Sequence, residues 1–100
     1  MGLNRYAKRR DENEPEILAA LRKVGLPTIR QDSPFDQLVG IRSRWIPFEI
    51  KDGSKPPSKR ILTPSEEDFR ALCAYYRLPY FVVSSVDEAL SAVRAVEAQA

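Results

Sequence analysis

The sequence contains no histidine and a single cysteine, Cys73. Without histidine, the chain cannot build Ser-His-Asp triads, histidine-ligated zinc sites or the histidine pairs of many ribonucleases. A lone cysteine excludes an intrachain disulfide and a cysteine-rich zinc site, and it fits a reducing compartment. Any catalysis must therefore rest on carboxylates, lysine, arginine, tyrosine, serine or Cys73, and Cys73 itself is expected to serve in packing.

Long hydrophobic runs are also missing from the sequence. No stretch approaches the roughly 20 apolar residues of a membrane span, and residues 1–14 lack the apolar segment of a secretory signal. We therefore expect a cytoplasmic protein. With 43% hydrophobic and 30% charged residues in a chain of 100, the composition is that of one ordinary globular domain with one core.

The net charge of +2 is too small to indicate a nucleic-acid partner by itself. Its distribution is more informative, because basic side chains gather at the N-terminus and in the loop that follows segment 45–51. We interpret residues 1–10 as a basic arm ahead of a single domain, residues 11–100. A solvated tail and a solvated loop explain these charges about as well as phosphate contact does. The candidate phosphate contacts are Arg9, Arg10, Lys55, Lys59 and Arg60.

Three helices are predicted from hydrophobic spacing and capping signals. The first covers about 13–24, with Asn13 as the cap and Glu16 at the third position of a capping box. The second begins at Thr63, with Glu66 completing its box, and the third begins at Ser85. An apolar stripe on the second helix is expected to face the core, and its members are Phe69, Leu72, Cys73 and Tyr76.

Strands are expected at about 26–31, 36–41 and 45–51, with a short buried strand at 80–83. Together with the helices they give the order α-β-β-β-α-β-α. Pro47 cannot donate a hydrogen bond to a neighbouring strand, so it favours an edge position or a bulge for the third strand.

The end of the third strand carries the residues best suited to catalysis and metal binding. The apolar residues of segment 46–50 alternate toward the core, whereas Glu49 and Lys51 project together on the other face. With Asp36 they form the pattern D-x12-E-x-K. Two carboxylates from adjacent strands can share a hard divalent cation, and the lysine can orient water or balance developing charge. By spacing alone, a solvent-exposed ion pair explains this pattern more readily than catalysis does.

These residues, in their order and setting, resemble the PD-(D/E)XK nucleases, and among them the small stand-alone VRR-NUC-like enzymes of phages and prophages. The resemblance covers nearly the whole chain. It implies an α/β fold with a restriction-endonuclease-like core, in which helices flank a central mixed β-sheet. The stretches that carry it are "DENEPEILAALRKVG", "FDQLVGI", "FEIKDGSKPPSKRILTPSEEDF" and "YFVVSSVDEAL".

The resemblance implies a role for each motif residue. Asp36 and Glu49 correspond to metal ligands and Lys51 to the catalytic lysine. Glu16 corresponds to a further metal ligand from the first helix, and its place in the predicted capping box is an equal alternative. Phe35 stands where the family usually has proline. The implied activity is an endonuclease that hydrolyses DNA phosphodiester bonds with Mg²⁺ or Mn²⁺, and the resemblance further implies a preference for branched or structured DNA such as Holliday junctions.

One site per chain favours a homodimer if two strands are to be cut. The alternative interpretation is a nucleic-acid-binding module on the same fold that has lost metal chemistry. Glu66 is expected to cap its helix rather than to serve the site.

Overall fold

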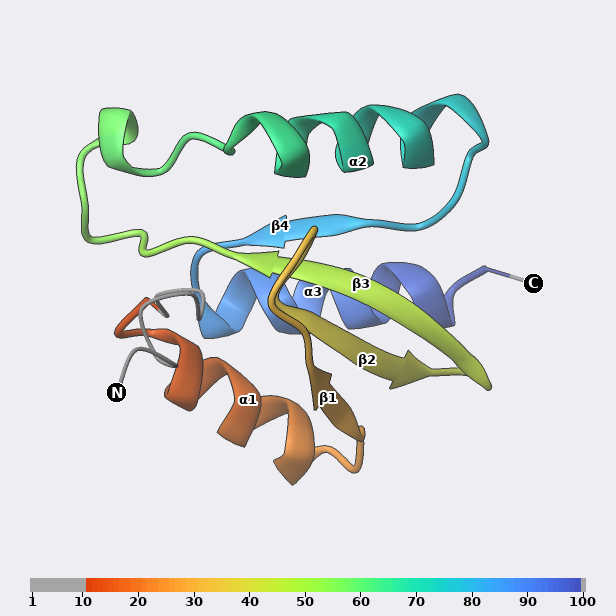
Figure 1. The fold of residues 1–100 in the computed structure, drawn as a ribbon. Helices are drawn as coiled ribbons and strands as arrows, with labels where there is room; N and C mark the ends of the chain where they lie inside the picture. The colour runs from red at the N-terminus through yellow and green to blue at the C-terminus, as the bar shows by residue number, and fades with distance from the viewer. Residues whose placement is uncertain (1–10, 100) are drawn as a thin grey trace, which may run out of the picture.

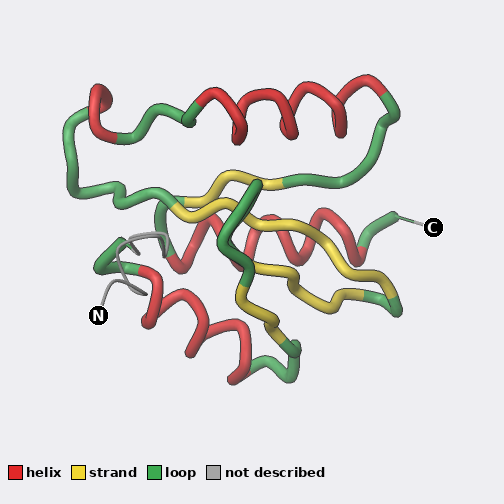
Figure 2. Tube along the Cα trace, viewed as in Figure 1, coloured by secondary structure: helices red, strands yellow, loops and turns green. Residues whose placement is uncertain are grey.

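A computed structural model describes residues 11–99 and organises them around one four-stranded mixed sheet with three helices (Figures 1 and 2). The predicted α/β class and the order of its elements are confirmed. The predicted basic arm, residues 1–10, lies outside the described residues. None of the described helices is long and apolar enough to cross a membrane. The elements are α1 (Glu14–Lys23), β1 (Thr28–Arg30), β2 (Gln37–Ile41), β3 (Arg44–Ile50), the 3-10 turn η2 (Pro57–Lys59), α2 (Pro64–Tyr75), β4 (Phe81–Val83) and α3 (Val86–Glu97).

The sheet has the strand order β1-β2-β3-β4. Strands β1, β2 and β3 form an antiparallel meander, and β4 then pairs in parallel with β3. Arg42 and Ser43 connect β2 to β3 with positive φ angles of 53° and 67°, the backbone typical of a two-residue hairpin turn. A parallel strand requires a long crossover, and the loop 51–63 with α2 supplies it.

The prediction of an edge position for the strand with Pro47 is wrong, because β3 lies between β2 and β4. The carbonyl of Phe48 accepts from the amide of Asp36 on the β2 side, so the nitrogen of the preceding residue points toward β4. Strand β4 begins opposite Phe48. The missing N–H of Pro47 therefore lies beyond the end of the β3–β4 ladder, and no ladder hydrogen bond is sacrificed.

The two faces of the sheet are covered unequally. Helices α1 and α3 lie together on one face, and α2 lies alone on the other (Figure 1). The hydrophobic core fills the first of these spaces and draws its side chains from both helices and from β2, β3 and β4. Its buried members are Ile17, Leu21, Val39, Ile41, Ile46, Phe48, Ile50, Val83, Ala89, Ala92, Val93 and Val96.

The start of α1 differs from the prediction. Asn13 precedes the helix, but its side chain makes no capping hydrogen bond. Its Nδ2 instead donates to the carbonyl oxygens of Lys51 and Ser84, at 2.9 and 3.0 Å. The predicted capping box with Glu16 is therefore wrong: the tertiary contacts of Nδ2 orient the Asn13 side chain, and its Oδ1, which would have accepted from the helix, has no hydrogen-bond partner among the described residues.

Helix α2 begins as predicted. The Thr63 side chain accepts from the Glu66 amide, and the Glu66 side chain accepts from the Thr63 amide. The Ser85 cap of α3 is confirmed as well. The expected inward stripe of α2 is only partly correct, because Cys73 is buried and Phe69 half-buried, whereas Leu72 and Tyr76 are exposed. Helix α2 thus contacts the sheet along a narrow line.

Candidate active site

Glu49 lies near the end of β3 on the face that α2 covers, because its neighbours Phe48 and Ile50 point into the core. It is completely buried, with 0% of its surface exposed. Lys51 follows directly after the strand, and its Nζ lies 3.3 Å from Glu49 Oε2. The expectation that these two side chains lie together is met, but the exposed ion pair considered as an alternative is not what forms. The pair is sequestered beneath α2.

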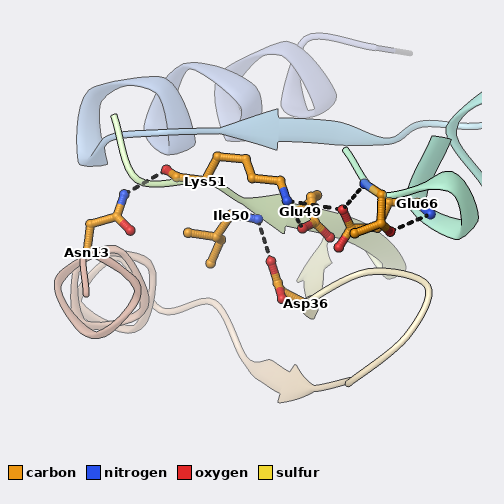
Figure 3. Close-up of polar contacts among 7 residues, drawn as sticks. Asn13, Asp36, Glu49, Ile50, Lys51 and Glu66 are labelled. Carbon is orange, nitrogen blue, oxygen red and sulfur yellow. Dashed lines mark hydrogen bonds and ion pairs between the residues drawn. The ribbon is translucent and has the colours of Figure 1, made fainter. Parts of the chain in front are cut away.

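A second carboxylate, that of Glu66 on α2, also contacts Lys51. Glu49, Lys51 and Glu66 together are called the ion-pair cluster. Lys51 Nζ donates to Glu66 Oε1 at 3.0 Å (Figure 3). The same oxygen accepts from the backbone amide of Thr63 at 2.9 Å. Glu66 therefore caps its helix and contacts Lys51 at the same time, so helix capping does not exclude a place beside the candidate site.

The backbone of Lys51 is fixed on both sides. Its amide donates to the carbonyl oxygen of Val83 at 3.0 Å, and its own carbonyl accepts from Asn13. A side chain that leaves a backbone held in this way starts from a defined position. The ammonium group is therefore placed by β4, by Asn13 ahead of α1 and by α2, although Lys51 itself lies outside any regular element.

Asp36 is buried and lies directly before β2. Its Oδ2 accepts from the backbone amide of Ile50 at 2.7 Å, which ties the loop after β1 to the end of β3 (Figure 3). The adjacent Phe35 stacks against Phe69 of α2 with ring centroids 5.0 Å apart. Phe35 thus joins this loop to α2, and Asp36 is hydrogen-bonded to the residue that follows Glu49.

The structure does not bring Glu16 to this region. Glu16 is exposed, whereas Glu14 is buried and accepts from Gln37 Nε2 through its Oε2 at 2.8 Å. Residues 14, 17 and 21 share one face of α1, and Ile17 and Leu21 of that face belong to the core. Glu14 therefore lies on the core face of the sheet with its partner Gln37, which pairs with Phe48, and Glu49 lies on the opposite face.

Two further acidic residues lie near the site and were not predicted from the sequence. Burial raises the pKa of Asp11, the charges of Lys51 and Lys55 oppose this rise, and the charges of Asp36 and Asp52 add to it. Asp11 is therefore within electrostatic reach of all four residues. Hydrogen bonds from the side chain and backbone of Ser54 lower the pKa of Asp52.

The charge state of Lys51 follows from the same contacts. Burial by itself lowers the pKa of the ammonium group. The hydrogen bond to Glu66 and the charge of Glu49 outweigh burial, so the pKa of Lys51 is raised above its usual value. Lys51 is a fixed cation at neutral pH and does not act as a general base there.

The residue types of this region suit a hard metal cation, but their side chains are not arranged around one point. Carboxylates come from Asp36 and Glu49, whereas Glu14 and the side-chain oxygen of Gln37, which lacks a hydrogen-bond partner among the described residues, lie on the other face of the sheet. Oxygen donors of this kind are preferred by Mg²⁺ and Mn²⁺. In the range 11–99, however, no three acidic, cysteine or histidine side chains converge as a metal-binding group. The two carboxylates therefore fit a hard metal ion by residue type, and the described residues do not form a complete ligand set around them.

The candidate phosphate-binding residues lie on the crossover loop. Lys55 and Lys59 are exposed, whereas Arg60 is half-buried and its Nε makes no hydrogen bond to the described residues. Arg9 and Arg10 lie outside the part of the chain that the structure describes. The loop leaves β3 at Lys51 and enters α2 before Glu66, so it borders the ion-pair cluster on its way between the two.

Compared with known proteins, the chain matches no family model, no curated protein and no solved structure.

Proposed function

We propose that this chain is a metal-dependent endonuclease of the PD-(D/E)XK type that hydrolyses phosphodiester bonds in DNA. One observation carries the proposal: Glu49 and Lys51 form a buried pair at the end of a central strand, with Asp36 hydrogen-bonded to the residue between them. A buried ion pair is a costly way to stabilise a fold, because apolar residues of similar size often do as well or better. Function therefore explains the pair better than stability does.

The architecture supports the same proposal. An antiparallel meander followed by a helical crossover to a parallel strand, in the order α-β-β-β-α-β-α, agrees with the restriction-endonuclease-like core that the resemblance implies. Glu49 lies on the central strand β3, and Asp36 and Lys51 are tied to the sheet by hydrogen bonds with Ile50 and Val83, which suits a site that needs fixed geometry.

Asp36 and Glu49 are the residues that would hold Mg²⁺ or Mn²⁺ in this proposal. Glu16 is exposed on α1, and Glu14 is buried against Gln37 on the other face of the sheet, so neither is assigned as a ligand. Such an ion supplies Lewis acidity, which activates water and neutralises phosphate charge.

Lys51 contributes charge in this proposal. Its raised pKa keeps the group protonated at neutral pH, so it can stabilise the negative charge that develops on a phosphate during hydrolysis. Its two carboxylate contacts fix the ammonium group in position beforehand. A preorganised cation costs little reorganisation when the reaction occurs.

DNA is the proposed partner, with the exposed lysines of the crossover loop as contacts to its phosphates. Lys55 and Lys59 lie between the end of β3 and the start of α2, so DNA bound to this loop would lie close to the ion-pair cluster. The preference for branched or structured DNA, the homodimer and the phage or prophage setting rest on the resemblance.

One observation favours the alternative, a nucleic-acid-binding module without catalysis. Glu49 is completely buried, and Lys51 already contacts two carboxylates. In such a module the cluster would tie α2 to the sheet, and the basic loop alone would contact the nucleic acid.

Single-turnover cleavage separates these two functions. Wild type is incubated with linear, nicked and four-way-junction DNA in Mg²⁺, in Mn²⁺ and in EDTA. We expect metal-dependent cleavage that falls on the order of 100-fold in Lys51→Met and in Glu49→Gln, as for loss of one preorganised electrostatic group. Lys23→Met, at the exposed end of α1, is the matched control and should cut at the wild-type rate.

Circular dichroism at the assay temperature establishes that each variant is folded. Lys51→Met and Glu49→Gln should still bind DNA, because the basic loop is unchanged in both. Equal cleavage by wild type and by both folded variants would remove these residues from the site. DNA binding by a wild-type protein that cuts none of the substrates in either metal would establish the binding module instead.

A further inference from the structure

The outer side of α2 carries large apolar side chains that face solvent. Leu72 is 52% exposed, Tyr75 79% and Tyr76 63%. Trp45 at the start of β3 and Leu78 after α2 are also about half exposed. A monomeric soluble protein seldom gathers this many large apolar side chains in one place unless the surface binds something. These five residues are called the α2 patch below.

The members of the α2 patch adjoin one another. Trp45, Leu72 and Leu78 line one groove of about 440 Å³ between α2 and β3, floored by Pro47 and Cys73 among others. Tyr76 lies one helical turn beyond Leu72, and its ring packs against that of Tyr75 with centroids 4.9 Å apart. The patch is therefore one continuous surface on the face of the sheet away from the core.

The composition of the groove favours a protein occupant over nucleic acid. Arg44 is the one charged residue among the described residues that line it, and its Nη2 is hydrogen-bonded to Gln99 Oε1 at 3.2 Å. A polyanion binds through many cationic contacts, which this groove does not offer. The exposed lysines of the crossover loop lie at the other end of α2.

The area of the α2 patch agrees with what a stable dimer needs. Three aromatic rings that each can bury about 150–250 Å², together with two leucines, at these exposures offer on the order of 500 Å² of apolar surface. A standard interface buries about 800 Å² per partner, of which about 65% is apolar in homodimers. The patch can thus supply most of the apolar share of such an interface.

We propose that a second copy of this chain covers the α2 patch, with the two α2 helices antiparallel about a two-fold axis near Leu72. A symmetric antiparallel pair brings residue 72 − n opposite residue 72 + n. Asp68 of one copy then faces Tyr76 and the adjacent Arg77 of the other. Both charged residues are exposed, so opposite charges meet at each end of the contact.

This arrangement has a geometric consequence for the two sites. Glu66 lies six residues before Leu72, so the Glu66 residues of the two copies are about 18 Å apart along the helix axes at 1.5 Å per residue. The two ion-pair clusters would lie at opposite ends of the shared helix pair. The surface is inferred without reference to nuclease chemistry, so the test of the interface and the test of the proposed function are independent.

Crosslinking tests the arrangement directly, because Cys73 is the only native cysteine. In a Cys73→Ala background, Leu72→Cys lies next to the proposed axis and should give a covalent dimer with a short bis-maleimide. Ile61→Cys in the same background is the matched control, because Ile61 is 70% exposed and lies outside the patch; it should give no covalent dimer. Equal crosslinking at both positions, or none at position 72, would overturn the proposal.

Sedimentation velocity of the full chain provides the second measurement. Wild type should be dimeric, and Leu72→Asp should weaken dimerisation on the order of 30-fold, as for a central hot-spot residue. Leu72 is half exposed, so the variant should fold, and circular dichroism verifies this. Fluorescence of Trp45, the only tryptophan, should shift to shorter wavelength as the dimer forms. A wild-type monomer at all concentrations, or a dimer that Leu72→Asp leaves intact, would refute the interface.

Discussion

Replacing Lys51 by methionine should destabilise the protein as well as affect any cleavage. The side chain of Lys51 is only 14% exposed, and the side chains of Glu49 and Glu66 are 1% and 4% exposed. Methionine keeps most of the length and apolar surface of the lysine stem but removes the charge. The substitution therefore isolates the effect of taking one cation away from two buried carboxylates.

The magnitude follows from the burial of the partners. Removing one member of a buried ion pair costs about 3–5 kcal/mol, mostly because a buried charge is left without compensation. Lys51 keeps some contact with solvent, so we expect the lower end, about 3 kcal/mol in the free energy of unfolding. The double variant Lys51→Met/Glu49→Gln should recover on the order of 2 kcal/mol of this loss, since a neutral amide needs no counter-charge.

Urea unfolding at pH 7 measures both variants against wild type. With a slope of about 1.5 kcal/mol per molar urea, a loss of about 3 kcal/mol moves the midpoint down by about 2 M. Lys23→Met should leave the midpoint within about 0.3 M of wild type. A Lys51→Met midpoint equal to that of the control, or a double variant less stable than the single one, would show that the cluster is solvated and that the reasoning is wrong.

Two further predictions concern charge. The pKa of Lys51 is raised in the folded protein, so its ion pairs contribute stability that is fully present below its ordinary pKa and is lost as the pH rises through the folded value. The wild-type urea midpoint should therefore fall above about pH 10.5, and Lys51→Met should lack this part of the fall. Neutralising Lys55, Lys59 and Arg60 together should reduce the salt dependence of DNA binding by up to roughly 0.9 in log–log slope for each phosphate that these side chains neutralise. An unchanged slope would mean that the loop does not touch DNA.

Elements with strong local signals were predictable from the sequence. Thr63, Pro64 and Glu66 encode the start of α2 within four residues, and the structure forms the capping box they specify. The alternation of segment 46–50 likewise placed Phe48 in the core and Glu49 on the opposite face. In both cases, the information lies in neighbouring residues, and the rest of the fold agrees with it.

Features that depend on distant contacts were not predictable from local patterns. Asn13 and Glu16 satisfy the capping-box pattern, but the carbonyls of Lys51 and Ser84 compete for the Asn13 side chain. Extending the buried stripe of α1 back by three residues from Ile17 would have identified Glu14 as the buried acidic residue of this helix. Helical spacing placed Tyr76 in a stripe, yet spacing cannot reveal that α2 meets the sheet along a narrow line.

Helix α2 contributes only Glu66 and Cys73 to the buried residues, and none of its side chains belongs to the core cluster between the sheet and the other two helices. Segments with so little buried apolar surface open by local unfolding at a lower free energy than the global transition. Such an opening would uncover Glu49 while β3 and the core stay folded. Because Glu66 both caps α2 and contacts Lys51, fraying of the first turn and release of the lysine are one event. The amides at the start of α2 should thus exchange with solvent on the timescale that sets access to Glu49.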